Sequence, residues 1–284
     1  MRNSIETASR DLELYLNLAR TSKLENRIRK FLRHPQKYVS HLLYKVGLSM
    51  APDRRIRTCF GSSMTIPLWD QNAVILFYTG TLAPEELAMT RYLKQLLTEN
   101  DVFFDVGANI GYFSSLAVTC GSSVHAFEPN DRLMPYVRKN AGAEVRIVHS
   151  ALSDHIGTAE FFDTTASGKS GTSSLVRPKG ESSTLSVPVT TLDAYCEHQE
   201  IPTVIKIDVE GAEAQVLTGG RKTITAHAPI ILMEVLRGER EADSQRAITL
   251  LEECSYEKYA IAPDGSLIPY TPHALNLVFT KNKP

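Results

Sequence analysis

The stretch DVFFDVGANIGYFSSLAV, residues 101–118, decides the fold. A short apolar strand, residues 102–105, ends in the acid Asp105, and a loop with two glycines, Gly107 and Gly111, leads into a helical pattern. In α/β sheets, ligands bind beyond the carboxyl ends of the strands, where such loops lie. The junction therefore predicts a ligand site, and the strands that follow indicate its ligand.

From residue 101 onwards the chain alternates strand and helix patterns. We predict strands at residues 102–105, 124–127, 145–148, 204–208, 230–235, 256–261 and 275–280. Helical patterns lie between them, at residues 110–119, 131–140, 211–222 and 240–253. This alternation predicts an α/β fold with a Rossmann-like, doubly wound sheet that is mainly parallel and covered by helices on both faces. Residues 157–191 interrupt it as an inserted hairpin around the polar loop TTASGKSGTSS.

Residues 1–55 predict a helical, basic N-terminal extension. Residues 1–50 hold ten Lys or Arg against four Asp or Glu, although the whole chain has a net charge of −1. We expect His34-Pro35 to break the helix. Its apolar side is formed by Ile28, Phe31 and Leu32. Residues 21–50 fit two interpretations, a peripheral contact with anionic lipid or packing on the core or on another subunit of a homo-oligomer.

Residues 56–284 are predicted to form the main domain. Within it, residues 56–100 read as β-prone pieces followed by a helix at 83–97, with Pro84 in the first helical turn. We predict a hairpin turn at residues 69–72, in the middle of the β-prone stretch.

The bulk composition narrows the class of protein. A hydrophobic fraction of 43% fits one large domain plus an appendage, and the net charge of −1 gives no indication of nucleic-acid binding. The four cysteines lie far apart with no metal-binding spacing, which fits a reducing compartment. No apolar run reaches about 18 residues, and the N-terminus lacks the apolar block of a signal peptide. We therefore expect a cytoplasmic protein.

Three kinds of nucleotide-binding loop compete for the stretch after Asp105. A P-loop needs GxxxxGK[ST], but Tyr112 follows Gly111 where that loop has lysine. A dinucleotide fingerprint needs GxGxxG, and one glycine is missing. The pattern Asp-x-Gly-x-x-x-Gly is instead typical of class I methyltransferases that bind S-adenosylmethionine (AdoMet). AdoMet carries no phosphate, so the glycines let the backbone approach its amino-acid end and sugar, while Asp105 accepts from its ammonium group.

The next two strands add to this site. Glu128 ends the strand in VHAFEPN, 21 residues after Gly107, where a carboxylate accepts two hydrogen bonds from ribose hydroxyls. NAD enzymes use an acid at the same point, so Glu128 predicts a ribose without choosing the ligand. The third strand runs into HSALSD, residues 149–154, whose backbone and small side chains are placed to flank an adenine.

Several blocks, in order, resemble one family. They are FFDVGANIGYFS, AFEPN, ALSDHIGTAEF, GTSSL, TTLDAY, IKIDVEGAEAQVLTGG and ILMEV, within about residues 80–240. They resemble the FkbM-type methyltransferases, class I AdoMet-dependent enzymes associated with O-methylation of sugars and polyketides. The resemblance implies a seven-stranded sheet whose last strand is antiparallel. It also implies that AdoMet is lined by Asp105, Gly107, Asn109, Gly111, Glu128, Ser150, Ala151 and Leu152.

Carboxylates gather where the acceptor is expected. Methyl transfer needs a nucleophile aligned with the methyl group and, for a hydroxyl, a base that takes its proton. Asp208 ends the fourth strand and Glu210 follows in the turn, while Glu234 closes the next strand. We predict that Asp208 or Glu210 contacts the acceptor as the base and that Glu234 orients it. Lys206 lies on the same strand face as Asp208, as a catalytic residue or as a structural ion-pair partner. In a second version, two of the carboxylates hold a divalent cation such as Mg²⁺.

The loop GKSGTSSL, residues 168–175, is the predicted lid, with Ser173 and Ser174 as polar contacts to a sugar. The function that fits these residues is AdoMet-dependent O-methylation of a small-molecule or glycan hydroxyl. Two alternatives stay open. An NAD-linked oxidoreductase shares the sheet and Glu128 but lacks GxGxxG, and a non-catalytic AdoMet-binding scaffold would act through its basic N-terminus.

Overall fold

The computed structural model describes residues 2–19, 34–45, 53–178 and 180–282. The chain divides into two compact units, Met1–Leu87 and Ala88–Pro284. Residue 55, where we placed the boundary of the extension, lies inside strand β1, and the division into an extension and a main domain stays a prediction.

The first unit combines a hairpin with helices. Its elements are α1 (Arg2–Ala19), α3 (Pro35–Lys45), β1 (Asp53–Arg57), β2 (Ser63–Pro67) and α4 (Gln71–Thr79), and α5 (Pro84–Leu96) begins within it. β1 and β2 pair antiparallel, and α1 contacts α4. Pro35 is the first residue of α3, a position that tolerates proline. Ile28, Phe31 and Leu32 lie outside the described residues, so the proposed face of residues 21–50 stays a prediction.

The hairpin turn that we predicted at residues 69–72 is wrong. The strands of this hairpin are joined earlier, where the amide of Thr58 donates to the carbonyl of Ser62 at 2.9 Å. Residues 71–79 form α4 instead. Asp70 caps that helix by accepting the amide N–H of Ala73 at 2.9 Å, and Gly80 ends it in the left-handed conformation. A short apolar run does not distinguish a strand from a buried helix by periodicity, and the cap decides between them.

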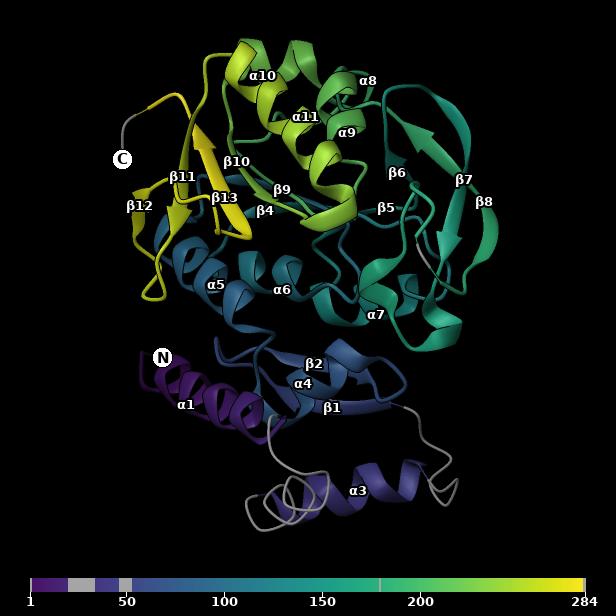
Figure 1. Ribbon diagram of the computed structural model, residues 1–284, viewed down its shortest axis with the longest axis vertical. Coiled ribbons are helices and arrows are strands. Elements are labelled where there is room, and N and C mark those ends of the chain that lie inside the picture. The colour runs from purple at the N-terminus through teal and green to yellow at the C-terminus, as the bar shows by residue number, and fades with distance from the viewer. Residues whose placement is uncertain (1, 20–33, 46–52, 179, 283–284) are drawn as a thin grey trace. The chain divides into compact units, whose positions relative to one another are not determined.

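The second unit is built on one large sheet (Figure 1). Its strands lie in the order β12-β11-β13-β10-β9-β3-β4-β5. Their bounds are β3 Val102–Val106, β4 Ser123–Phe127, β5 Arg146–Val148, β9 Val204–Ile207, β10 Ile230–Glu234, β11 Glu257–Ile261, β12 Leu267–Pro269 and β13 Asn276–Thr280. β13 is antiparallel to both neighbours, whereas β3, β4, β5, β9 and β10 pair in parallel. The predicted seven strands and the antiparallel last strand are confirmed.

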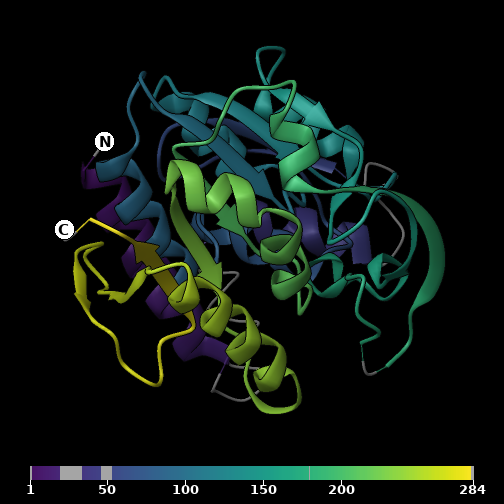
Figure 2. The same cartoon turned by 90° about the horizontal axis from the view of Figure 1, so that it is seen from above.

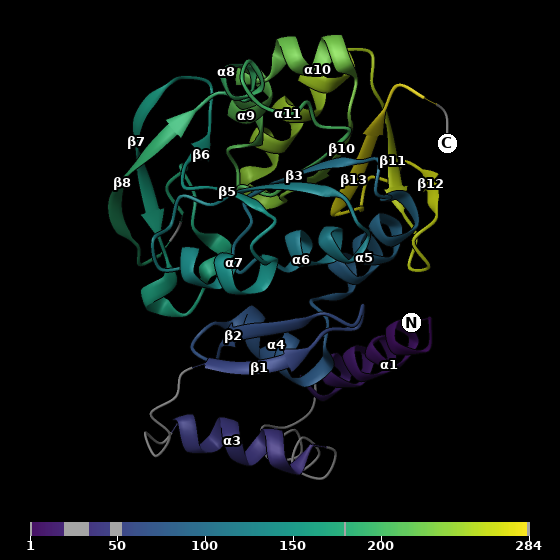
Figure 3. The same cartoon turned by 180° about the vertical axis from the view of Figure 1, so that it is seen from behind.

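Helices cover both faces of this sheet. Figures 1 and 3 show α6 and α7 on one face and α8 to α11 on the other, and Figure 2 shows the second group from above. The bounds are α6 Tyr112–Thr119, α7 Met134–Ala141, α8 Leu192–Cys196, α9 Glu213–Gly219, α10 Arg221–His227 and α11 Glu241–Glu253. The central strands carry fully buried apolar side chains such as Phe104, Ile205 and Ile231, as expected for a sheet covered on both faces.

An eighth strand, β12, extends the edge beyond β11. It returns through a turn at Asp264-Gly265, where the amide of Ala262 donates to the carbonyl of Ser266 at 2.9 Å and Gly265 has φ +88°. Our sequence reading left this strand out, although Pro-Asp-Gly is a turn signal.

The segment predicted as an inserted hairpin contributes to a second, three-stranded sheet. This sheet contains β6 (Ala151–Leu152), β7 (Gly157–Asp163) and β8 (Ser183–Thr190), and it lies beside the β5 edge of the main sheet (Figure 3). The polar loop between β7 and β8 contains two short 3₁₀ turns, Thr165–Ser167 and Ser170–Thr172. The hairpin therefore carries the predicted lid to the carboxyl ends of the main strands.

The four cysteines, Cys59, Cys120, Cys196 and Cys254, are free. Within the described part of the chain, none of the helices combines the length and apolar character that crossing a bilayer requires. The cytoplasmic location stays a prediction.

Candidate active site

The loop after β3 brings its backbone against two neighbouring strands. Gly107 has φ +83°, and a Cβ built there would lie 2.0 Å from the carbonyl oxygen of Asp208. The amide of Gly107 donates to the carbonyl of Phe127 at 3.1 Å. Position 107 therefore requires glycine for two reasons, its left-handed backbone and the close approach of the turn after β9.

Glu128, at the end of β4, is bound to this loop. Its Oε2 accepts the amide N–H of Asn109 at 2.8 Å, and its Oε1 accepts that of Asn130 at 2.9 Å. The carboxylate is only 4% exposed. Burial raises the pKa of Glu128 to about 7, although the two backbone hydrogen bonds oppose the shift. Each carboxylate oxygen has a further lone pair, so Glu128 can also accept hydroxyl groups of a ligand.

Lys206 joins the loop after β3 to the turn after β9. It lies opposite Asp105 in the strand pairing, with its Nζ 3.6 Å from Asp105 Oδ1 and 3.0 Å from Asp208 Oδ2. The same Nζ donates to the carbonyl of Gly107 at 3.4 Å. Burial lowers the pKa of Lys206, but attraction to Asp208 and Asp105 outweighs burial and leaves the pKa above its usual value. Lys206 therefore stays charged and holds these segments together.

Asp105 lies beneath the loop and is fully buried. Its Oδ2 accepts the hydroxyl of Ser114 at 2.6 Å. Among the described residues, nothing donates a hydrogen bond to its Oδ1. Asp105 therefore supports the loop from below, with one oxygen available to a donor.

The turn after β9 is fixed by a buried acid. Glu213, in the first turn of α9, is 0% exposed and accepts the amide N–H groups of Val209 at 3.2 Å and Gly211 at 3.1 Å. Glu210, between them, has φ 57°. A non-glycine residue in the left-handed region is strained, and such strain is common where a side chain is held for function.

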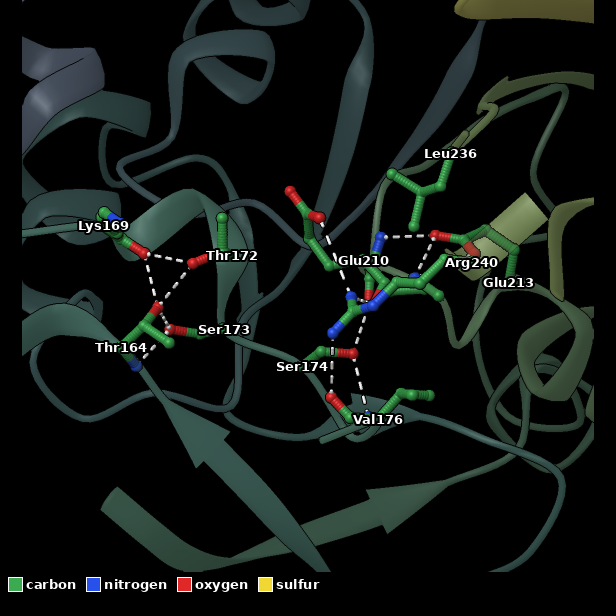
Figure 4. A network of polar contacts seen from close by, with 12 residues as sticks. Thr164, Lys169, Thr172, Ser173, Ser174, Val176, Glu210, Glu213, Leu236 and Arg240 are labelled. Carbon is green, nitrogen blue, oxygen red and sulfur yellow. Dashed lines mark hydrogen bonds and ion pairs between the residues drawn. The ribbon is translucent and has the colours of Figure 1, made fainter. Parts of the chain in front are cut away.

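Arg240, just before α11, clamps the same turn (Figure 4). Its guanidinium donates to the carbonyl of Glu210, and its Nη2 donates to the carbonyl of Val176, the residue after the lid, at 3.3 Å. Nη1 of Arg240 also lies 4.0 Å from Glu210 Oε2. The sequence analysis missed Arg240, because no local motif joins it to a turn 30 residues earlier.

Glu210 has a basicity suited to proton transfer near neutral pH. Burial raises the pKa of Glu210 to about 8, and the carboxylates of Asp208 and Glu213 add to the shift, while Arg240 opposes it. Carboxylate oxygens of Asp208, Glu210 and Glu234 lie within 4.8 Å of one another. The acid-rich mouth that the sequence predicted is therefore brought together, with the cations of Lys206 and Arg240 beside it.

A cavity opens over the carboxyl ends of β3, β4 and β9. Of the predicted residues, those that line it are Gly107, Asn109, Glu128, Ala151, Leu152, Ser173, Ser174, Asp208 and Glu210. Those that do not line it are Asp105, Gly111, Ser150, Lys206 and Glu234. Gly111 is the N-cap of α6, and the Ser150 hydroxyl donates to the carbonyl of Pro188 at 3.0 Å.

Further residues line the cavity. Ser170, Gly171 and Leu175 belong to the predicted lid, whereas the sequence analysis did not name Phe127, Pro129, Leu133 and Phe161 as site residues. Phe127 and Pro129 are the sequence neighbours of Glu128, so their place in the chain would have identified them as lining residues. Phe161 comes from β7, and only the folding of the inserted hairpin brings it to the cavity.

The two predicted lid serines line the cavity but have protein partners. The hydroxyl of Ser174 donates to the carbonyl of Val209 at 2.8 Å and accepts the amide of Val176 at 3.0 Å. The hydroxyl of Ser173 accepts the amide of Thr164 at 3.0 Å. Ser174 thus ties the lid to the turn after β9, and the predicted contacts of both serines with a sugar stay predictions.

Comparisons with known proteins agree with one another on the class of protein. The sequence model described as "Methyltransferase FkbM domain" matches residues 105–258. The 2-O-methyltransferase NoeI of Sinorhizobium fredii is 28% identical over 170 residues, covering 52% of this chain and 70% of the relative. The hexuronic acid methyltransferase AglP of Haloferax volcanii is also 28% identical over 170 residues, covering 58% of this chain and 68% of the relative.

Among solved structures, Methyltransferase FkbM from Methylobacillus flagellatus is 18% identical, with a TM-score of 0.43. The match covers 74% of this chain and 55% of that chain, so this chain spans about half the length of the solved protein.

Proposed function

The chain belongs to the family of FkbM methyltransferase domains, and we propose that it moves the methyl group of AdoMet to a hydroxyl of a sugar. One observation carries the proposal. Glu210, whose carboxylate is suited to accept a proton, lines the same cavity as Glu128, the acid placed to bind a ribose.

The residues of the cavity fit AdoMet. The bare backbone at Gly107 lets the loop approach a ligand closely, and no phosphate-binding lysine follows the loop. Glu128 is placed to hold the ribose, while Ala151, Leu152 and Phe161 supply the apolar wall that an adenine needs. Asp105 lies next to this cavity without lining it, and its Oδ1 accepts no hydrogen bond from the described residues but lies 3.6 Å from the ammonium of Lys206.

When bound, AdoMet supplies a methyl group already activated on a sulfonium. The protein has to align the acceptor and remove its proton. With AdoMet bound, Glu210 would take the hydroxyl proton onto its carboxylate as the oxygen–methyl bond forms and the methyl–sulfur bond breaks, which leaves S-adenosylhomocysteine. Asp208 is neutralised by Lys206 at 3.0 Å, so it serves as a fixed hydrogen-bond acceptor that orients the hydroxyl.

The acceptor class rests on the relatives. One is named as a 2-O-methyltransferase and the other as a hexuronic acid methyltransferase, and both match this chain over 170 residues. These names support a sugar hydroxyl over a polyketide as the acceptor.

Methyl transfer to a sugar hydroxyl is expected to persist without a divalent cation. Lys206 and Arg240 already place positive charge beside Asp208 and Glu210, so these carboxylates have cationic partners. Incubation with radiolabelled AdoMet and a panel of free and glycosidic sugars, with and without EDTA, tests this. Loss of activity in EDTA that Mg²⁺ restores would support the metal version instead, and failure to label any sugar would overturn the proposed acceptor class.

Affinity for S-adenosylhomocysteine is expected to be about tenfold weaker at pH 6 than at pH 8. Ribose hydroxyls bind the ionised form of Glu128, and a pKa of about 7 leaves about one carboxyl in eleven ionised at pH 6. Because this pKa is raised above the unfolded value, ionising Glu128 costs folding stability as the pH rises from about 4.5 to 7, and a bound ribose offsets that cost.

Calorimetric titration at both pH values measures the effect. Glu128→Gln is the matched variant, because it keeps the size of the side chain and removes its ionisation. We expect this variant to bind weakly at both pH values. A wild-type affinity that does not change between pH 6 and pH 8, or a Gln variant that keeps the pH dependence, would remove Glu128 from the ribose site.

A further inference from the structure

A second cavity meets the first at Glu210. It lies between the loop that joins β7 to β8, called the lid loop here because it contains the predicted lid, and the segment after β10, residues 236–240. Within the described part of the chain, Glu210 is the one residue that lines both cavities. Figure 4 shows its side chain between the lid hydroxyls and Arg240. A sugar held in this groove would therefore present its hydroxyl to the base at the point where the groove meets the cofactor cavity.

The groove has a polar wall with an excess of positive charge. Its cations are Lys169, Arg237 and Arg240, and its carboxylates are Glu181 and Glu210. The lid adds the hydroxyl groups of Thr164, Ser167 and Thr172. Apolar side chains come from Pro178 and Leu236, and no aromatic ring of the described residues lines it. An apolar acceptor is disfavoured here, because the polar wall would lose its water without gaining partners.

Two of the cations are fixed in place by backbone carbonyls. Arg240 donates to the carbonyls of Glu210 and Val176, which uses two of its five N–H donors. Arg237 donates to the carbonyls of Pro272 and Ala274. A guanidinium held this way loses little freedom when it binds, and its planar array of donors suits a carboxylate or a phosphate. Lys169, exposed in the lid, adds a third charge.

We propose that this groove is the acceptor site and that it takes a sugar bearing an anionic group, a carboxylate or a phosphate, beside the hydroxyl that Glu210 deprotonates. The inference rests on the proposed function only for the role of Glu210. Lys169 and Arg240 recognise the anion, and the lid hydroxyls accept and donate hydrogen bonds to the sugar. The groove thereby selects among sugars by charge, whereas the cofactor cavity is the same for every acceptor.

Direct binding to the full chain saturated with S-adenosylhomocysteine tests the groove without any turnover. The probes are methyl glucuronoside, glucose 6-phosphate and methyl glucoside, titrated by calorimetry or ligand-observed NMR. We expect at least one anionic probe to bind about tenfold more tightly than the neutral glucoside, and the preference to shrink in 0.5 M salt. The two anionic probes distinguish a carboxylate from a phosphate. Equal binding of all three, or no binding of either anionic sugar, overturns the inference.

A charge variant locates the binding. Lys169→Gln is expected to lower the affinity for the anionic probe about three- to tenfold and to leave the affinities for the glucoside and for S-adenosylhomocysteine unchanged. Lys169→Arg should keep the affinity for the anionic probe. The side chain is exposed, so folding does not depend on it. Lys222→Gln, an exposed lysine on α10 outside the groove, is the matched control. If Lys222→Gln also weakens binding of the anionic probe, or if Lys169→Gln also weakens binding of the neutral glucoside, the assignment of Lys169 to the anion site is overturned.

The outcomes separate this inference from the proposed function. If anionic sugars bind through Lys169 but receive no methyl group, the groove stands and methylation of sugars falls. If neutral glucosides are methylated as well as glucuronosides, the function stands and the inference falls.

Discussion

Replacing Glu210 by glutamine is expected to lower kcat for methyl transfer about 10²- to 10⁴-fold, the usual contribution of a general base. The affinity for S-adenosylhomocysteine should change little, because Glu128 and the loop at Gly107 are untouched. The reason is geometric first, since Glu210 lines both cavities. Single-turnover transfer of a labelled methyl group measures the rate, and calorimetry measures the affinity.

The pH profile gives Glu210 a second readout. Burial raises its pKa to about 8, and a base has to be ionised to work, so the wild-type rate should rise with pH up to about 8 and then level off. Glu210→Gln should lose this rise. Stability changes in the opposite direction, because a carboxyl whose folded pKa is raised loses stabilisation as the pH rises from its unfolded value, near 4.5, through 8. The Gln variant should therefore be the more stable protein at pH 9 and not at pH 5.

Glycine at position 210 separates backbone strain from chemistry. Glu210 has φ 57°, and a left-handed conformation costs a non-glycine residue about 1–2 kcal/mol. Glu210→Gly should therefore be as inactive as the Gln variant and yet melt about 2–4 °C higher. Glu253→Gln, which alters an exposed ion pair with Arg221, is the control for removing a carboxylate. Normal turnover in either Glu210 variant would show that the proton leaves by another route.

The main sheet could be predicted from the sequence because its strands are buried on both faces. Such strands are continuous apolar runs, and glycine or an acid follows the central strands β3, β4 and β9 directly, at Gly107, Glu128 and Asp208. Asp208 and Glu234 were predicted to meet for this reason, since the ends of neighbouring parallel strands share one edge. Their carboxylates do lie within 4.8 Å. The positions of these acids at the ends of neighbouring strands were enough to predict this part of the site.

Other features depend on contacts between distant segments, which no local pattern records. Arg240 reaches the turn at Glu210 only because α11 packs on α9. The predicted lid is tied to the turn after β9 through Ser174, whose hydroxyl donates to the carbonyl of Val209, 35 residues away. Helix α4 was misread as strand because the Asp70 cap outweighs a β-prone composition. The periodicity of apolar residues indicates which face of an element is buried. Hydrogen bonds between a side chain and the backbone, such as the Asp70 cap, decide where the element begins.

Replacing Gly107 by alanine is expected to abolish both ligand binding and methyl transfer and to lower the melting temperature by about 10 °C or more. The added Cβ would stand 2.0 Å from the carbonyl oxygen of Asp208 and 3.0 Å from its carbonyl carbon. Backbone atoms cannot rotate away as a side chain can, so the loop after β3 or the turn after β9 has to shift. Either shift separates the wall that faces AdoMet from the turn that carries Glu210.

Gly142→Ala is the matched control, because it isolates the cost of the backbone conformation. Gly142 has φ +90°, close to the +83° of Gly107, but a Cβ there meets nothing within 4 Å. Because Gly142 has ψ 173°, in a region that residues other than glycine rarely adopt, this change should cost about 1–3 kcal/mol and leave methyl transfer intact. Thermal melting of both variants, with S-adenosylhomocysteine titrations, compares them directly. If the two alanine variants lose the same stability and both bind S-adenosylhomocysteine, backbone strain alone explains why position 107 requires glycine. A larger loss at Gly107 means that the active site depends on contact between the two backbones.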